Sequence, residues 1–195
     1  WSSGLGRWEV TSGLDPAEPD MDRVTSYVFD AAGNVVTLAA HLPDSSAGGE
    51  GSAEVTQYVY GVDTDTTDNP IASATYSEDL LGSVIYPDGD AASSPADRTV
   101  FYGYNRLGEM IAMEDQNDTR HSYSLDDLGR VTQDEAVTAM SSEIDDTFDT
   151  LVYDYDGLGR LERVQTLKMS DNSVANAVGF VYSPLWEMTK LLQDH

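Results

Sequence analysis

The stretch Leu151-Val152-Tyr153-Asp154-Tyr155-Asp156-Gly157-Leu158-Gly159-Arg160-Leu161 decides the fold of this chain. Tyr153 and Tyr155 alternate with other side chains, which is the period of two expected of a strand with one buried face. Asp156 suits the first position of a tight turn, because its carboxylate accepts hydrogen bonds from nearby backbone N–H groups. Gly159 falls where such a turn needs a left-handed residue. Alternation resumes after Arg160, so the stretch predicts a β-hairpin.

The same unit recurs along the chain with one or two tyrosines, an Asp or Asn, a glycine and, in two copies, an arginine. The positions are Tyr27, Asp30 and Gly33; Tyr102, Tyr104, Asn105 and Gly108; Tyr123, Asp126, Gly129 and Arg130; and Tyr153, Tyr155, Asp156, Gly159 and Arg160. Weaker copies run from Tyr76 to Val84, around Gly82, and from Phe180 to Met188, where Trp186 replaces the glycine. Ser3 to Trp8 reads as half a copy around Gly6. Recurrence every ~20–50 residues is typical of a repeat array.

The pattern Tyr-x-Tyr-Asp-x-Leu-Gly-Arg, nearly complete from Tyr153 to Arg160, resembles the tyrosine–aspartate (YD) repeat of the rearrangement-hot-spot (Rhs) proteins. The C components of insecticidal toxin complexes and the teneurins carry related repeats. The resemblance extends from Gly4 to Met188 and includes Tyr102 to Glu109 as a close copy. It implies a sheet that spirals into a hollow shell, which in toxin-bearing members encloses a C-terminal effector domain.

The predicted fold is all-β, with tandem β-hairpin repeats forming one continuous twisted antiparallel sheet. Asp115-Gln116-Asn117-Asp118 is expected to be a second kind of turn, on the opposite end of the sheet from the repeat turns, so that each repeat adds about two strands. We expect residues 1–195 to be a single YD-repeat array that is truncated at both ends. Irregular loops are expected near residues 9–23, 43–53, 87–98 and 138–149, which are rich in Gly, Pro, Ser and acidic residues.

The chain is strongly acidic, with 35 Asp and Glu against 10 Lys and Arg and a formal net charge of −25. Such a charge repels phosphate backbones and anionic lipids, so we expect neither nucleic acid nor a membrane surface as a partner. Cysteine is absent, which excludes disulfides and thiolate chemistry. No apolar run approaches the ~18 residues needed to cross a bilayer.

Motifs for chemistry are weak. Asp154 and Asp156 sit two apart and are considered as a glycosidase pair, but the aspartate recurs in other copies, which favours a turn role. His41, His121 and His195 lack partners at metal-ligand spacing. Residues 63–68 are acidic but lack the glycine and distal glutamate of an EF-hand. The prediction is no catalytic residue, no cofactor and no metal.

The eleven tyrosines leave two interpretations open. Tyr27, Tyr102, Tyr123 and Tyr153 either stack on one another across adjacent repeats, or present an aromatic surface that binds sugars. The first interpretation fits a non-enzymatic shell segment whose partners are other repeats of the parent chain and an enclosed effector domain. The second fits a cell-surface carbohydrate-binding or adhesion module. By resemblance to the family, the parent protein is expected to be secreted or at the cell surface.

Overall fold

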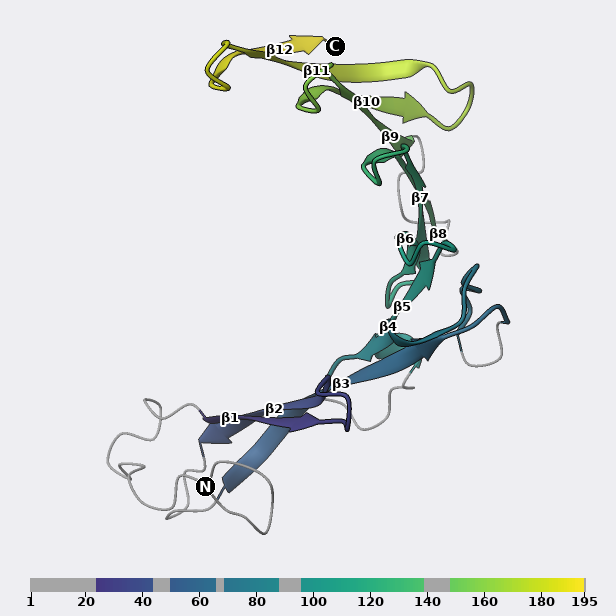
Figure 1. Cartoon of the computed structure of the whole chain (residues 1–195), viewed down its shortest axis with the longest axis vertical. Coiled ribbons are helices and arrows are strands. Elements are labelled where there is room, and N and C mark those ends of the chain that lie inside the picture. Colours follow the sequence, from purple (N-terminus) through teal and green to yellow (C-terminus); the bar gives the residue numbers. More distant parts are fainter. Residues whose placement is uncertain (1–23, 44–49, 66–68, 88–95, 139–147, 195) are drawn as a thin grey trace. The chain divides into compact units, whose positions relative to one another are not determined.

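The computed structural model describes residues 24–43, 50–65, 69–87, 96–138 and 148–194 (Figure 1). Its elements are β1 (Val24–Phe29), β2 (Val35–Pro43), β3 (Glu50–Val62), β4 (Ser77–Ile85), the 3-10 turn η1 (Ala96–Arg98), β5 (Thr99–Tyr104), β6 (Met110–Glu114), β7 (Thr119–Leu125), β8 (Val131–Thr138), β9 (Phe148–Tyr155), β10 (Leu161–Lys168), β11 (Val174–Tyr182) and β12 (Met188–Asp194). These residues contain no α-helix, which confirms the all-β prediction.

The strands lie in the sheet in chain order, from β1 to β12. Neighbouring strands pair antiparallel, as in β7–β8 and β9–β10, so the sheet is a meander without crossovers. The pairing register shifts where a strand meets its turn, for example between Ser124 and Leu125. Such shifts mark β-bulges, which bend and twist the strand locally.

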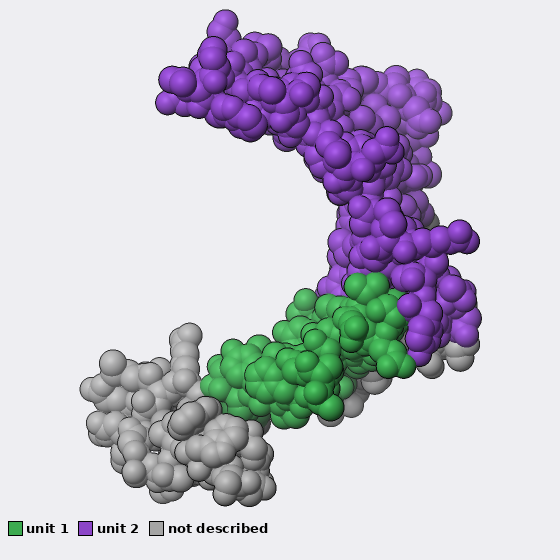
Figure 2. Space-filling view, viewed as in Figure 1, with its two compact units in different colours: residues 1–62, 77–100 green, residues 63–76, 101–195 purple. Residues whose placement is uncertain are grey.

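The chain divides into two compact units, residues 1–62 with 77–100 and residues 63–76 with 101–195 (Figure 2). In the first unit, β1 to β4 pair in sequence and Val62 and Val84 are buried. The backbone N–H of Tyr86 donates to the carbonyl of Arg98, which holds the start of β5 in place. Gly61 has a φ of 115°, at a register irregularity between β3 and β4.

The second unit contains β6 to β12, most of β5, and the segment 69–74, which bonds to β5. The Asn69 side-chain amide donates to the Tyr102 carbonyl at 3.1 Å, and the Ala74 N–H donates to the Tyr104 carbonyl at 2.6 Å. Ile71 is 2% exposed and its side chain lies over Gly103, where a side chain on the glycine would collide with it. Residues 69–74 form no strand.

Few side chains are buried in the described residues. The buried apolar residues are Val62, Ile71, Val84, Val100, Tyr104 and Ala112. Every residue of β12 is exposed. A single sheet layer with so small a core depends on contacts between neighbouring repeats, as repeat arrays do. Among the described residues, no helix is long and apolar enough to cross a membrane.

Three expectations need correction. Gly82 is not a turn residue: it lies inside β4, and its Cα faces the Gly61 carbonyl so closely that a Cβ would collide with it. The expected loops are shorter, because residues 50–53 belong to β3, 96–98 form η1, and 148–149 belong to β9. Asp115 to Asp118 has the same backbone bonds as the repeat turns, with Asp118 in the left-handed position at a φ of 56°. Gly6 and the expected loop residues 9–23, 44–49, 88–95 and 139–147 lie outside the described part.

Candidate functional site

The predicted Asp or Asn, glycine and arginine positions of the repeat lie at the hairpin turns, and the tyrosines lie in the strands before them. The Asp126–Arg130 turn shows the common geometry. The Asp126 N–H donates to the Arg130 carbonyl at 2.9 Å, and the Gly129 N–H donates to the Asp126 carbonyl at 2.9 Å. The Asp126 Oδ1 accepts the N–H groups of Leu128 and Arg130, both at 2.9 Å. Gly129 has a φ of 75°. This is a three-residue hairpin loop that ends in a left-handed residue and a bulge.

The same backbone bonds close the turns that begin at Asp30, Asn105, Asp115, Asp156 and Ser183. The left-handed residue is a glycine at four of the six turns, with φ of 93° at Gly33, 78° at Gly108, 75° at Gly129 and 82° at Gly159. The prediction of positive φ at these four glycines is therefore confirmed. Trp186, at 69°, takes this conformation in the last turn.

An arginine ends two of these turns and pairs with the aspartate that begins it. Arg130 donates from Nε and Nη2 to the Asp126 Oδ2, at 2.7 and 2.6 Å, and Arg160 repeats both distances with Asp156. The Arg130 side chain is the main cause of a lowered pKa of the Asp126 carboxyl. At Asp156 the largest cause of the lowered pKa is the Arg160 backbone N–H, followed by its side chain. Both carboxylates are thus occupied within their own turns.

Each of these arginines also contacts the next repeat. The Arg130 guanidinium carbon lies 4.3 Å from the Tyr155 ring centroid, and that of Arg160 lies 4.6 Å from the Tyr182 centroid. The Tyr155 hydroxyl donates to the Val131 carbonyl at 2.8 Å, and the Tyr182 hydroxyl donates to the Leu161 carbonyl at 2.8 Å. We call this arrangement of arginine, tyrosine ring and hydroxyl bond the repeat joint. Both joints connect one hairpin to the following one.

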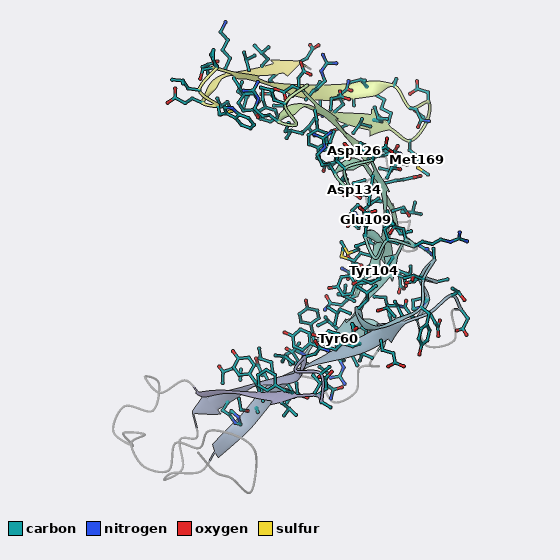
Figure 3. All side chains as sticks on the ribbon, in the orientation of Figure 1. Tyr60, Tyr104, Glu109, Asp126, Asp134 and Met169 are labelled. Carbon is teal, nitrogen blue, oxygen red and sulfur yellow. The ribbon has the colours of Figure 1, made fainter. Side chains whose placement is uncertain are left out.

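Side chains at the turn ends lie over the next turn as well. A Cβ on Gly129 would lie 2.5 Å from the Glu109 Oε1, and one on Gly159 would lie 3.0 Å from the Arg130 Nη1. Glu109 and Asp126, labelled in Figure 3, belong to the β5–β6 and β7–β8 turns, which are neighbours at the same end of the strands. The turn glycines therefore serve two purposes, because they adopt the left-handed conformation and leave room for the preceding turn.

Two turns have an amide–carboxylate pair where these two have arginine and aspartate. The Asn34 side-chain amide donates to the Asp30 Oδ2 at 3.1 Å, and the Asn105 amide donates to the Glu109 Oε2 at 2.7 Å. Backbone bonds from Asn34 are the largest cause of the lowered pKa of Asp30. The turn geometry therefore tolerates several side-chain pairs, whereas the repeat joint needs arginine.

Tyr102, Tyr123 and Tyr153 share one face of the sheet, as strand register shows. Met113 is opposite both Tyr102 and His121, and His121 is two residues before Tyr123. Asp134 is opposite both Tyr123 and Leu151, and Leu151 is two residues before Tyr153. Burial raises the pKa of the Tyr123 and Tyr153 hydroxyls, and the Asp134 carboxylate raises both further. The pKa of the Tyr104 hydroxyl is also raised, and burial is again the largest cause.

Two ring contacts run along a strand and not between repeats. Tyr123 stacks on His121 with ring centroids 6.1 Å apart, and Tyr27 has a tilted contact with Phe29 at 6.4 Å. The His121 Nδ1 lies 2.8 Å from the Asp134 Oδ1. His41 Nε2 lies 2.9 Å from the Ser26 hydroxyl in the first unit, and His195 is outside the described residues. No group of three metal-ligating side chains occurs in the described ranges.

No family model matches the sequence, and no curated protein matches it either. Among solved structures, the chain is similar to TcdB2-TccC3 at 14% identity and a TM-score of 0.29, over 88% of this chain and 11% of that one. The TcdB2-TccC3-Cdc42 crystal structure and the Photorhabdus luminescens Tc holotoxin pore each match at 13% identity and a TM-score of 0.28, over 88% of this chain and 10% of theirs. This chain thus spans about a tenth of those proteins. A likeness of this size assigns neither fold nor function.

Proposed function

We propose that this chain is a structural, non-catalytic segment of an Rhs/YD-repeat shell, of the kind that encloses or presents a C-terminal toxin or effector domain. The repeat joint is the observation that supports this proposal. Arg130 and Arg160 each bind their own turn and the tyrosine of the next hairpin, at 4.3 and 4.6 Å. These arginine and tyrosine contacts therefore connect one hairpin of the sheet to the next, as the wall of a shell requires.

The partners that follow from this function are other repeats of the same parent chain and an enclosed effector domain. A net charge of −25 disfavours nucleic acid and anionic lipid as further partners. By resemblance to the Rhs family, the proposed location of the parent protein is secreted or at the cell surface. The carboxylates of Asp126 and Asp156 are held by arginine and backbone N–H groups, which suits a structural role better than acid–base catalysis.

The test is protection of an enclosed domain in the longest natural polypeptide that contains this sequence. The intact polypeptide should leave its downstream region resistant to added protease. Replacing Arg130 and Arg160 with alanine should expose that region by opening the joints, while the control Arg163→Ala, on the exposed part of β10, should not. Equal protease sensitivity of the downstream region with and without the repeat segment would rule out the shell.

A second candidate is a carbohydrate-binding or adhesion module, and the shared tyrosine face favours it. Tyr123 and Tyr153 lie on that face beside the Asp134 carboxylate, which is paired with His121. Aromatic rings next to hydrogen-bonding groups are suited to stacking on sugar rings.

A glycan array distinguishes the two candidates. A binding module should retain a defined glycan, and Tyr123→Ala should abolish retention, whereas Tyr86→Ala, an exposed tyrosine of the first unit, should not. A shell segment should retain none.

A further inference from the structure

Four turns along one edge of the second unit each present an exposed leucine. The turns join β5 to β6, β7 to β8, β9 to β10 and β11 to β12. Since alternate turns of a meander lie at the same end of the strands, all four lie along one border of the sheet. Their leucines are exposed to 82%, 77%, 63% and 80%, in the order Leu107, Leu128, Leu158 and Leu185. We call this row the leucine edge.

The turn itself does not need leucine at this position. The leucine contributes its backbone N–H, which donates to the first side chain of the turn, for example from Leu128 to Asp126 at 2.9 Å. Ala32 and Asn117 make the same bond, at 2.9 and 2.8 Å, in the turns that begin at Asp30 and Asp115. Since the backbone bond accepts any residue, the turn does not account for the four apolar side chains, which are available for contact with a partner.

The spacing and area of the row match a particular partner. Successive turns are two strands apart, so the leucines repeat about every 10 Å. Each exposed leucine side chain offers on the order of 100 Å² of apolar area, and Trp186, 62% exposed in the last turn, adds a similar amount. The sum of about 500 Å² equals the apolar share of a standard interface, which buries ~800 Å² per partner.

We propose that the leucine edge is an interface between two copies of this chain, aligned antiparallel about a two-fold axis. A second copy offers the same ~10 Å repeat, so all four leucines find an apolar neighbour at once. The antiparallel alignment also places the first turn against the last. Arg106 and Glu187 are both exposed and lie in those two turns, so opposite charges meet at both ends. A parallel alignment would place Arg106 against Arg106.

The charge balance of the edge also favours a second copy. The four turns, residues 105–109, 126–130, 156–160 and 183–187, carry three arginines and five acidic residues, a formal charge of −2. The whole chain carries −25. Two copies that meet along this edge therefore bring together only a small part of the net charge of each chain. The interface goes beyond the proposed shell function, since it concerns contact between chains and not between repeats.

Sedimentation of the 195-residue chain over a concentration series, at about 0.15 M salt, tests the interface. The unaltered chain should show a monomer–dimer equilibrium. Replacing Leu107, Leu128, Leu158 and Leu185 with asparagine should weaken dimerisation at least ~100-fold, because most of the apolar contact is lost. Met169→Asn is the matched control: Met169 is 55% exposed, and it lies in the β10–β11 turn at the other edge (Figure 3). It should dimerise like the unaltered chain.

A charge reversal provides a test in which the leucines stay intact. Arg106→Glu should weaken the dimer roughly tenfold, because two like-charge contacts replace two attractive ones. Combining it with Glu187→Arg should restore dimerisation. Circular dichroism confirms that each variant is folded. A chain that stays monomeric at all concentrations overturns the interface, and so does a dimer that the leucine variant leaves unchanged. Neither result bears on protection of an enclosed domain.

Discussion

The guanidinium carbon of Arg130 lies 4.3 Å from the ring centroid of Tyr155, although 24 residues separate the two along the chain. Arg130 ends one turn, and Tyr155 is the second tyrosine of the next repeat. The tyrosine hydroxyl then donates to the carbonyl of Val131, the residue that follows the arginine. The arginine of one repeat and the second tyrosine of the next repeat thus form a single contact between the two repeats.

The coupling between Arg130 and Tyr155 should be measurable by a double-mutant cycle. Arg130→Ala and Tyr155→Ala should each destabilise the chain, and the double variant should cost less than their sum. We expect a coupling free energy of ~0.5–1 kcal/mol, which is typical of a partly exposed cation–π contact. Urea unfolding of the unaltered chain, the two single variants and the double variant measures this coupling free energy. Additive effects would mean that the stacking contributes nothing to stability.

Gly159 and Gly157 form a matched pair within one turn. Gly159→Ala should destabilise the chain by about 1–2 kcal/mol, because a left-handed φ of 82° is unfavourable for a residue with a Cβ. Gly157→Ala should be neutral or stabilising by up to ~1 kcal/mol, since open space surrounds its Cα and the unfolded chain loses freedom. Thermal or urea unfolding measures both. A reversed order of the two effects would contradict the turn geometry.

Gly82→Ala should destabilise the first unit although Gly82 has no left-handed conformation. The added Cβ would collide with the Gly61 carbonyl, which belongs to the backbone of the paired strand and cannot rotate away. A cost of ~1–3 kcal/mol is expected for such overpacking. Hydrogen exchange should show the loss of protection in β3 and β4 first. Gly33→Ala is a useful contrast, because its cost should be confined to the β1–β2 turn.

Acid should destabilise the chain through the turn aspartates. The folded pKa values of Asp126 and Asp156 are lower than the ordinary value of 3.8, so folding favours the ionised carboxylates. Their contribution is complete above the unfolded pKa and is lost as the pH falls through the folded pKa. The melting temperature should therefore decrease when the pH is lowered beyond about 4. The variant Asp126→Asn with Asp156→Asn should show a flatter pH profile.

Asparagine is a suitable replacement in that experiment because Asn105 starts a turn with the same backbone bonds. The double variant should therefore keep its hairpins, as circular dichroism can verify. If it has the same acid midpoint as the unaltered chain, the turn aspartates are not the groups responsible.

Added salt should stabilise the chain. A formal charge of −25 repels itself in the compact state, and ~0.15 M salt screens exposed charges beyond roughly 8 Å. The short Arg–Asp contacts of 2.6 Å are partly buried and are screened less. Urea midpoints at increasing sodium chloride measure the effect, and they should rise with salt. A falling midpoint would show that ion pairs outweigh the repulsion.

Sequence predicted the hairpins wherever local chemistry alone determines them. Asp156 followed by Gly159 specifies a turn because the carboxylate binds N–H groups within four residues and the glycine accepts a left-handed φ. Asp79 and Gly82 have the same spacing, yet they lie within β4. There, pairing with the 13-residue strand β3 overrides the local turn preference. Such long-range competition is invisible in a short motif.

The repeat joint was not predicted, although the sequence contains a signal for it. Arg130 precedes a repeat with tyrosine at the second aromatic position, Tyr155, and Arg160 likewise precedes Tyr182. Glu109 precedes a repeat that has Leu125 at that position. The arginine and the tyrosine therefore occur together across neighbouring copies. When each copy of the motif is considered by itself, the arginine has only the aspartate of its own turn as a partner.

The repeat joint has a consequence for how such chains change in length. Val131 and Leu161 occupy the same place after their arginines, and each accepts the hydroxyl bond of the following tyrosine. Excising residues 131–160 would connect Arg130 directly to Leu161, and Arg130 would then stack on Tyr182. A recombination event that removes or duplicates one whole hairpin thus leaves an intact junction behind it, so genes for such sheets can grow and shrink in hairpin steps.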